Sequence, residues 1–106
     1  MTLMELSSAL GNVLNELDRA LQTPGLSDAD WQSLYALRKH LDDQQRSLVA
    51  EQIDDENASF QDLTSQLKVA SAQLTQVIGD INKVEQTIGL LSQIASYGDK
   101  ILSLVG

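Results

Sequence analysis

Apolar residues recur every three or four positions through nearly the whole second half of this 106-residue chain. This spacing places side chains on one face of an α-helix and is typical of helices that pack against other helices. We therefore predict one long helix over about residues 59–97, roughly 57 Å long, and a short tail at 99–105. The series is Phe60, Leu63, Leu67, Ala70, Leu74, Val77, Ile81, Val84, Ile88, Leu91, Ala95, Gly98, Leu102 and Val105.

The first half of the chain contains signals for two further helices. Thr2 and Glu5 have the spacing of a capping box at the start of an apolar series, which predicts a helix over about residues 3–22. Pro24-Gly25 then interrupts the chain, and Asp28 opens a second helix over about residues 28–53, with acidic residues in its first turn where the helix dipole favours them.

The acidic segment after the second helix has two interpretations. Asp54, Asp55 and Glu56 are followed by Asn57, and this polar run predicts a turn at about residues 54–58. The alternative is one continuous helix from Asp28 to Tyr97, because acidic residues do not break helices and the apolar spacing extends back to earlier positions.

These elements predict a single all-α domain over residues 1–106. The architecture would be a three-helix bundle or helical hairpin with one long C-terminal helix of coiled-coil-like periodicity, and we expect it to be oligomeric. The long helix would extend about a dozen residues beyond its neighbours, over a segment, 86–98, that contains no charged residue. Exposed apolar surface of this kind marks an interface. The predicted partner or oligomer interface is Val84, Ile88, Leu91, Ile94, Ala95, Tyr97, Ile101, Leu102 and Val105.

Residue composition argues against catalytic and metal chemistry. The chain has no cysteine and a single histidine, His40, so we expect no enzyme activity, no metal site and no cofactor. The acidic run 54–56 lacks the glycine and the spacing of a calcium loop. Trp31 and Tyr35, one helical turn apart, are interpreted as a plug for the core rather than as a binding hot spot.

Net charge suggests what kind of partner the protein has. The net charge is −8, and residues 1–57 account for most of it, with eleven acidic against four basic residues. An acidic surface repels nucleic acid and attracts basic proteins, so we expect a second copy or another protein, basic if electrostatics contribute, and no nucleic acid. The candidate electrostatic surface is Asp42, Asp43, Glu51, Asp54, Asp55 and Glu56.

The sequence therefore predicts a non-enzymatic protein-interaction module that acts through the C-terminal end of the long helix. By analogy of size and charge, a bacterial accessory role is expected, such as a toxin inhibitor, an immunity protein or a secretion chaperone. The absence of cysteine and of a basic, then apolar leader favours the cytoplasm. The alternative is a membrane-active amphipathic protein using residues 77–105, although charges at Asp80, Lys83 and Glu85 interrupt any spanning segment.

Overall fold

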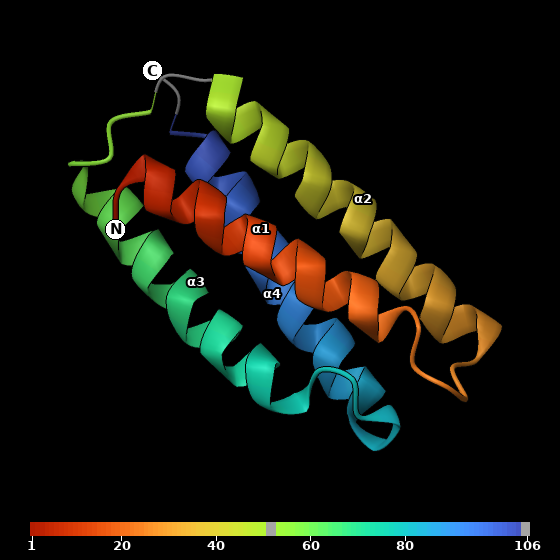
Figure 1. Cartoon of the computed structure of the whole chain (residues 1–106). Helices are drawn as coiled ribbons and strands as arrows, with labels where there is room; N and C mark the ends of the chain where they lie inside the picture. Colours follow the sequence, from red (N-terminus) through yellow and green to blue (C-terminus); the bar gives the residue numbers. More distant parts are fainter. Residues whose placement is uncertain (51–52, 105–106) are drawn as a thin grey trace.

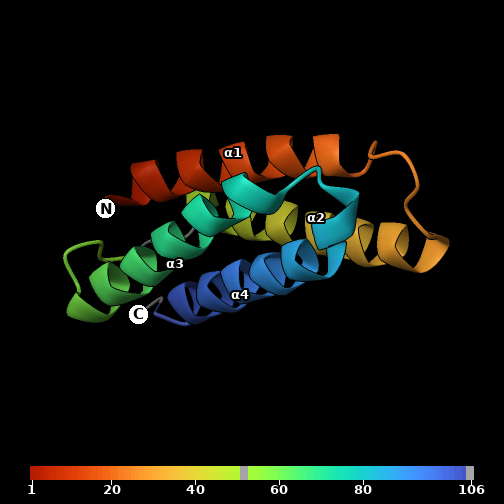
Figure 2. The ribbon, with the colours of Figure 1, turned by 90° about the horizontal axis from the view of Figure 1, so that it is seen from below.

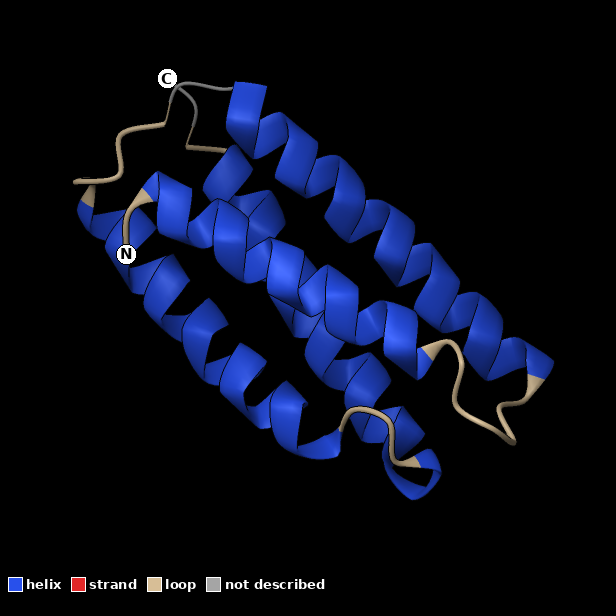
Figure 3. Cartoon of the chain, viewed as in Figure 1, coloured by secondary structure: helices blue, strands red, loops and turns tan. Residues whose placement is uncertain are grey.

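The computed structural model of the chain describes residues 1–50 and 53–104, and this part is built entirely from helices and their connections (Figures 1 and 3). The predicted all-α class is confirmed. Four α-helices pack together, where three were expected, and their bounds are Leu3–Ala20 (α1), Asp28–Ala50 (α2), Ala58–Val77 (α3) and Val84–Leu102 (α4), with a 3₁₀ turn, η1, at Ile81–Lys83.

The capping box predicted at the start of α1 is present. The Glu5 backbone N–H donates to Thr2 Oγ1 at 3.1 Å, and the Thr2 backbone N–H donates to Glu5 Oε1 at 3.0 Å. Each bond satisfies an amide that a helix start would otherwise leave without a partner. The hydrogen bond from Thr2 also lowers the pKa of the Glu5 carboxyl below its ordinary value.

The chain leaves its helical path between α2 and α3, as the turn interpretation expected. Residues 53–57 are not helical, and α3 starts at Ala58 with Asn57 as its N-cap. The Asn57 side-chain oxygen accepts from the Ser59 backbone N–H at 2.8 Å, a bond that competes with helix continuation. The alternative of one continuous helix from Asp28 to Tyr97 is therefore wrong.

The predicted single helix over 59–97 is also wrong, because the chain reverses direction after Val77. Gly79 has φ +88, a left-handed conformation that glycine adopts at no steric cost and that ends α3. Asp80 then caps η1, with its Oδ1 accepting from the Asn82 backbone N–H at 2.9 Å. Figure 2 shows α4 returning alongside α3.

The reversal makes the two halves of the long apolar series pack against each other. Buried positions of α3, such as Leu67 and Leu74, belong to the same core as Leu91 of α4. A helix of coiled-coil periodicity that folds back in this way needs no second chain to cover its apolar face. The predicted helix end at about residue 97 is also wrong, because Gly98 lies inside α4, which continues to Leu102.

The four helices enclose one hydrophobic core. α4 packs against both α3 and α2, and α1 packs mainly against α2 and less against α3. The fully buried large side chains come from all four helices: Leu6, Leu10, Leu17, Leu34, Leu41, Leu48, Phe60, Leu67, Leu74, Leu91, Ile94 and Ile101. Burying such side chains contributes about 1.5–3 kcal/mol each to the free energy of folding.

Candidate interaction surface

The residues predicted as a partner interface are mostly inside the bundle. Ile88, Tyr97 and Leu102 are half-buried against the core, and Val105 lies outside the described residues. The others are buried: Val84, Leu91, Ile94, Ala95 and Ile101. The expectation of an uncovered apolar end is therefore wrong. α4 is apolar over a wide arc because it packs against two helices, α3 and α2.

A polar cluster holds α4 against α2. Gln44 is 3% exposed, and its Nε2 donates to the Ala95 carbonyl at 2.6 Å and to Asp99 Oδ1 at 2.8 Å. His40 Nε2 lies 3.0 Å from the same carboxylate oxygen. Gly98 leaves room for the Gln44 side chain, which a Cβ at position 98 would overlap. This surface of α4 is thus occupied by α2.

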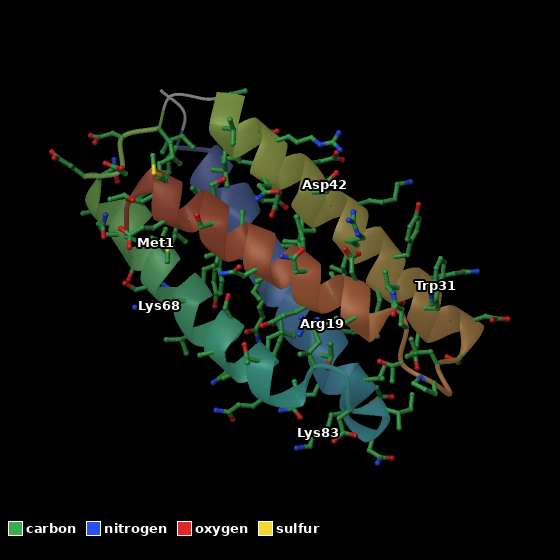
Figure 4. The ribbon with its side chains drawn as sticks, in the orientation of Figure 1. Met1, Arg19, Trp31, Asp42, Lys68 and Lys83 are labelled. Atoms are coloured by element: carbon green, nitrogen blue, oxygen red, sulfur yellow. The ribbon has the colours of Figure 1, made fainter. Side chains whose placement is uncertain are left out.

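The aromatic pair on α2 is exposed rather than buried. Trp31 is 42% exposed and Tyr35 is 43% exposed, so the interpretation of this pair as a core plug is wrong. Their rings stack with centroids 5.1 Å apart, and Lys39 Nζ lies 5.5 Å from the Tyr35 centroid. Figure 4 labels Trp31 near the start of α2. The two rings thus contact each other and Lys39, and the part of their surface that stays exposed is available to a partner.

A second apolar feature lies at the opposite end of the same helix. Met4 is 80% exposed and Val49 is 75% exposed. With Leu3, Ser7 and Leu48 they line a shallow, mainly apolar groove between the start of α1 and the end of α2. Contiguous exposed apolar surface, unlike a single exposed apolar side chain, is a mark of an interaction site.

The aromatic pair and the groove lie along one line of residues on α2. This line, here called the α2 stripe, follows a spacing of three and four residues and therefore lies along one side of the helix. Two of its members contact α1: Arg38 Nε donates to Asp18 Oδ1 at 2.6 Å, and Gln45 Nε2 donates to the Ser7 carbonyl at 3.0 Å. The stripe comprises Trp31, Tyr35, Arg38, Asp42, Gln45 and Val49.

The Arg38–Asp18 pair gives the surface its principal ionic contact with α1. The Arg38 hydrogen bond lowers the pKa of the Asp18 carboxyl below its ordinary value, and the same bond raises the pKa of Arg38. Both side chains remain about one third to one half exposed. Their interaction is therefore weakened by solvent and leaves polar atoms available for further contacts.

Three of the six acidic residues singled out in the sequence have hydrogen-bond or ion-pair partners for their side chains. Asp42 pairs with Arg46 at 2.9 Å, and Asp55 Oδ2 accepts from the Leu3 backbone N–H at 3.0 Å. Asp54 Oδ1 accepts from the Glu56 backbone N–H at 3.0 Å. Asp43 is exposed, and Glu51 lies outside the described residues. Within residues 1–50 and 53–104, no three His, Cys, Asp or Glu side chains are grouped so as to hold a metal ion.

Sequence reasoning missed the groove at Met4 and Val49, and it placed the aromatic pair in the core. The signal that could have found them is a second apolar spacing on α2. The line through Leu34, Leu41 and Leu48 is the buried one, and the α2 stripe runs beside it. A helix with two such lines cannot bury both against a single core.

Two further findings complete the description of the surface. No helix among the described residues is long and apolar enough to cross a membrane. In comparisons with known proteins, no family model, no curated protein and no solved structure matches the chain.

Proposed function

We propose that the protein is a non-enzymatic interaction module that binds a protein partner on the outer face of the α1–α2 pair. One observation carries this proposal. Among the described residues, six large apolar side chains are exposed, and four of them lie on this face: Trp31 and Tyr35 near the start of α2, Val49 near its end, and Met4 beside Val49 at the start of α1. Aromatic and aliphatic anchors of this kind dominate the binding energy of protein interfaces.

The surface has the mixed character of a binding face. Its ends are apolar, and its middle carries the charged residues Arg38, Asp42 and Arg46. Interfaces between separately folded proteins combine apolar anchors with polar groups that fix orientation. Small size and net acidity fit an accessory role such as toxin inhibitor, immunity protein or secretion chaperone, which is part of this proposal by analogy.

The test compares surface variants that should leave the fold intact. Trp31→Ser and Val49→Ser remove anchors of the proposed face, and Val69→Ser, on α3 with 59% exposure, is the matched control. Partners are trapped by chemical cross-linking and identified by mass spectrometry, with the second copy counted as one candidate. We expect the same partner with the wild type and Val69→Ser, and its loss with the other two.

An equal loss in all three variants, or no loss in any, would contradict the proposed face. Circular dichroism of each variant checks that a lost partner does not reflect a lost fold. Because Val49 and Val69 are mostly exposed, we expect their variants to change stability by less than about 0.5 kcal/mol. Trp31→Ser also removes the stack with Tyr35 and should cost about 0.5–1.5 kcal/mol, which leaves the protein folded.

The membrane-active alternative uses residues 77–105 and makes a different prediction. Most of the large apolar residues of α4 are in the core or packed against it, so insertion of α4 into a lipid surface would require the bundle to open. Opening exposes apolar residues of the other helices and costs a large part of the folding free energy. We expect no co-sedimentation with vesicles of phosphatidylcholine and phosphatidylglycerol. Binding by the wild type would favour the alternative.

A further inference from the structure

The α2 stripe has a pattern that reads the same in both directions. The steps between its six members are 4, 3, 4, 3 and 4 residues, which is symmetric about position 40. Trp31 and Val49 form the ends, Tyr35 and Gln45 the next pair, and Arg38 with Asp42 the centre. The end residues are 18 positions apart, or about 27 Å along the helix axis.

A stripe of this kind is complementary to itself when two copies of the helix run antiparallel. Interfaces with a two-fold axis use the same patch on both partners, so each contact occurs twice and the patch must match its own inverse. Laid antiparallel with the axis at position 40, the stripe sets Trp31 opposite Val49 of the second copy. It sets Arg38 opposite Asp42 of the second copy.

We propose that the partner of the outer α1–α2 face is a second copy of this chain, bound through antiparallel pairing of the two α2 stripes. This inference rests on the proposed function, because it names the partner for that face. The aromatic pair of each copy then covers the exposed Val49 of the other, beside the groove that contains Met4. Four exposed apolar anchors become buried by one symmetric contact.

Charge complementarity at the centre of the α2 stripe favours a second copy of this chain as the partner. Arg38 uses Nε and one terminal nitrogen toward Asp18, and a guanidinium has further N–H donors. Asp42 uses Oδ2 toward Arg46, which leaves its second carboxylate oxygen as an acceptor. Across the two-fold axis these donors and acceptors face each other twice, so opposite charges meet although the whole chain is acidic.

A basic foreign partner fits this face less well. Between residues 38 and 46, three basic residues stand against two acidic ones, so the middle of α2 attracts a basic partner less than the net charge of −8 suggests. The two occupants also differ in their response to salt. Binding of a basic partner by an acidic protein weakens steeply as salt screens the attraction, whereas two chains of charge −8 repel each other at long range and gain from screening.

Solution mass provides the first test. Light scattering of the wild type should give twice the chain mass of 11.6 kDa, and the dimer fraction at high salt should be at least as large as at low salt. Val49→Asp should raise the dissociation constant of the dimer at least about tenfold, and the matched control Val69→Asp should leave it unchanged. A wild type that stays monomeric at about 1 mM, where even a weak complex is half formed, overturns the proposal.

Disulfide cross-linking tests the register of the two helices. Because the chain has no native cysteine, only the introduced thiols can form a disulfide. Trp31→Cys and Val49→Cys proteins are prepared separately, mixed and oxidised. The mixture should form a disulfide dimer, because each mixed pair keeps one native Trp31–Val49 contact and brings the two cysteines together. Either variant alone should stay uncross-linked, since its cysteines would lie about 27 Å apart.

The outcomes separate this inference from the proposed function. Cross-linking of each variant with itself but not in the mixture would indicate a parallel or different interface and overturn the antiparallel pairing. A monomeric wild type that still binds a foreign protein through Trp31 and Val49 would overturn the second copy as partner and retain the interaction face. A wild type that neither dimerises nor binds a foreign protein through Trp31 and Val49 would overturn both proposals.

Discussion

One side of α4 and the α2 stripe both carry large apolar residues at helical spacing, on the α2 stripe only at its two ends, and their surroundings are opposite. On α4, Leu91 and Ile94 are fully buried between α2 and α3. On α2, Trp31 and Val49 lie on the outside of the bundle. A periodic spacing identifies which side chains share a face. It does not tell whether another part of the same chain covers that face.

The difference comes from one reversal of the chain. Gly79 and Asp80 turn α4 back along α3, so the surface expected to overhang becomes an inner surface. With α4 in this position, α2 packs against both α4 and α1 and buries Leu34, Leu41 and Leu48 in the core. In the α2 stripe beside them, Arg38 and Gln45 contact α1, whereas Trp31, Tyr35 and Val49 stay exposed. This is why the candidate interface moves from α4 to α2.

The largest expected effect comes from a charge placed on the buried side of α4, compared with the same charge placed on the α2 stripe. Leu91→Asp buries a carboxylate among apolar side chains and should destabilise the fold by at least about 4 kcal/mol. Val49→Asp changes a residue that is 75% exposed and should alter stability by less than about 0.5 kcal/mol. Thermal unfolding followed by circular dichroism measures both. A Leu91→Asp protein that stays folded would show that Leu91 does not lie in the hydrophobic core.

A smaller effect distinguishes the two glycines of α4. A Cβ at Gly98 would overlap Gln44, so Gly98→Ala should destabilise the protein by about 1–3 kcal/mol. Nothing lies within 4 Å of a Cβ at Gly89, so Gly89→Ala should stabilise the helix by roughly 0.5–1 kcal/mol. Urea midpoints of the two variants should move in opposite directions. A stabilising Gly98→Ala would contradict the close contact between α4 and α2.

The smallest effect concerns the ion pair beside the α2 stripe. The pKa of Asp18 in the folded protein lies below its ordinary value of 3.8, so its pairing with Arg38 contributes stability above that pH. The contribution is lost as the pH falls through the lowered pKa. Asp18→Asn should therefore cost well under about 1 kcal/mol near neutral pH, because the pair is partly exposed.

The measurement is the urea midpoint of wild type and Asp18→Asn as a function of pH. The difference between the two should shrink as the pH falls below 3.8. A difference that grows in acid would contradict the assigned pairing. Because Arg38 belongs to the α2 stripe, the same variant also tests whether its alignment by Asp18 matters for self-association.

Local chemistry explains the parts of the fold that sequence reasoning placed well. The capping box at Thr2, the Pro24-Gly25 break and the polar turn at residues 54–58 act on backbone groups a few residues away. Such signals depend on neighbours in sequence, so they can be read before the fold is known. The reversal at Gly79 also has a local signal, Gly-Asp followed by Asn82, but the unbroken apolar spacing around it indicated one helix.

The sequence by itself determined that the chain is helical, where most helices begin, and which side chains share a face, because these depend on backbone capping and on 3.6 residues per turn. Only the tertiary structure decided that the apolar side of α4 is covered and that Trp31, Tyr35 and Val49 are exposed. Burial depends on which helices become neighbours after the chain reverses at Gly79. Neighbours in space, unlike the helical period, are a property of the whole packed bundle.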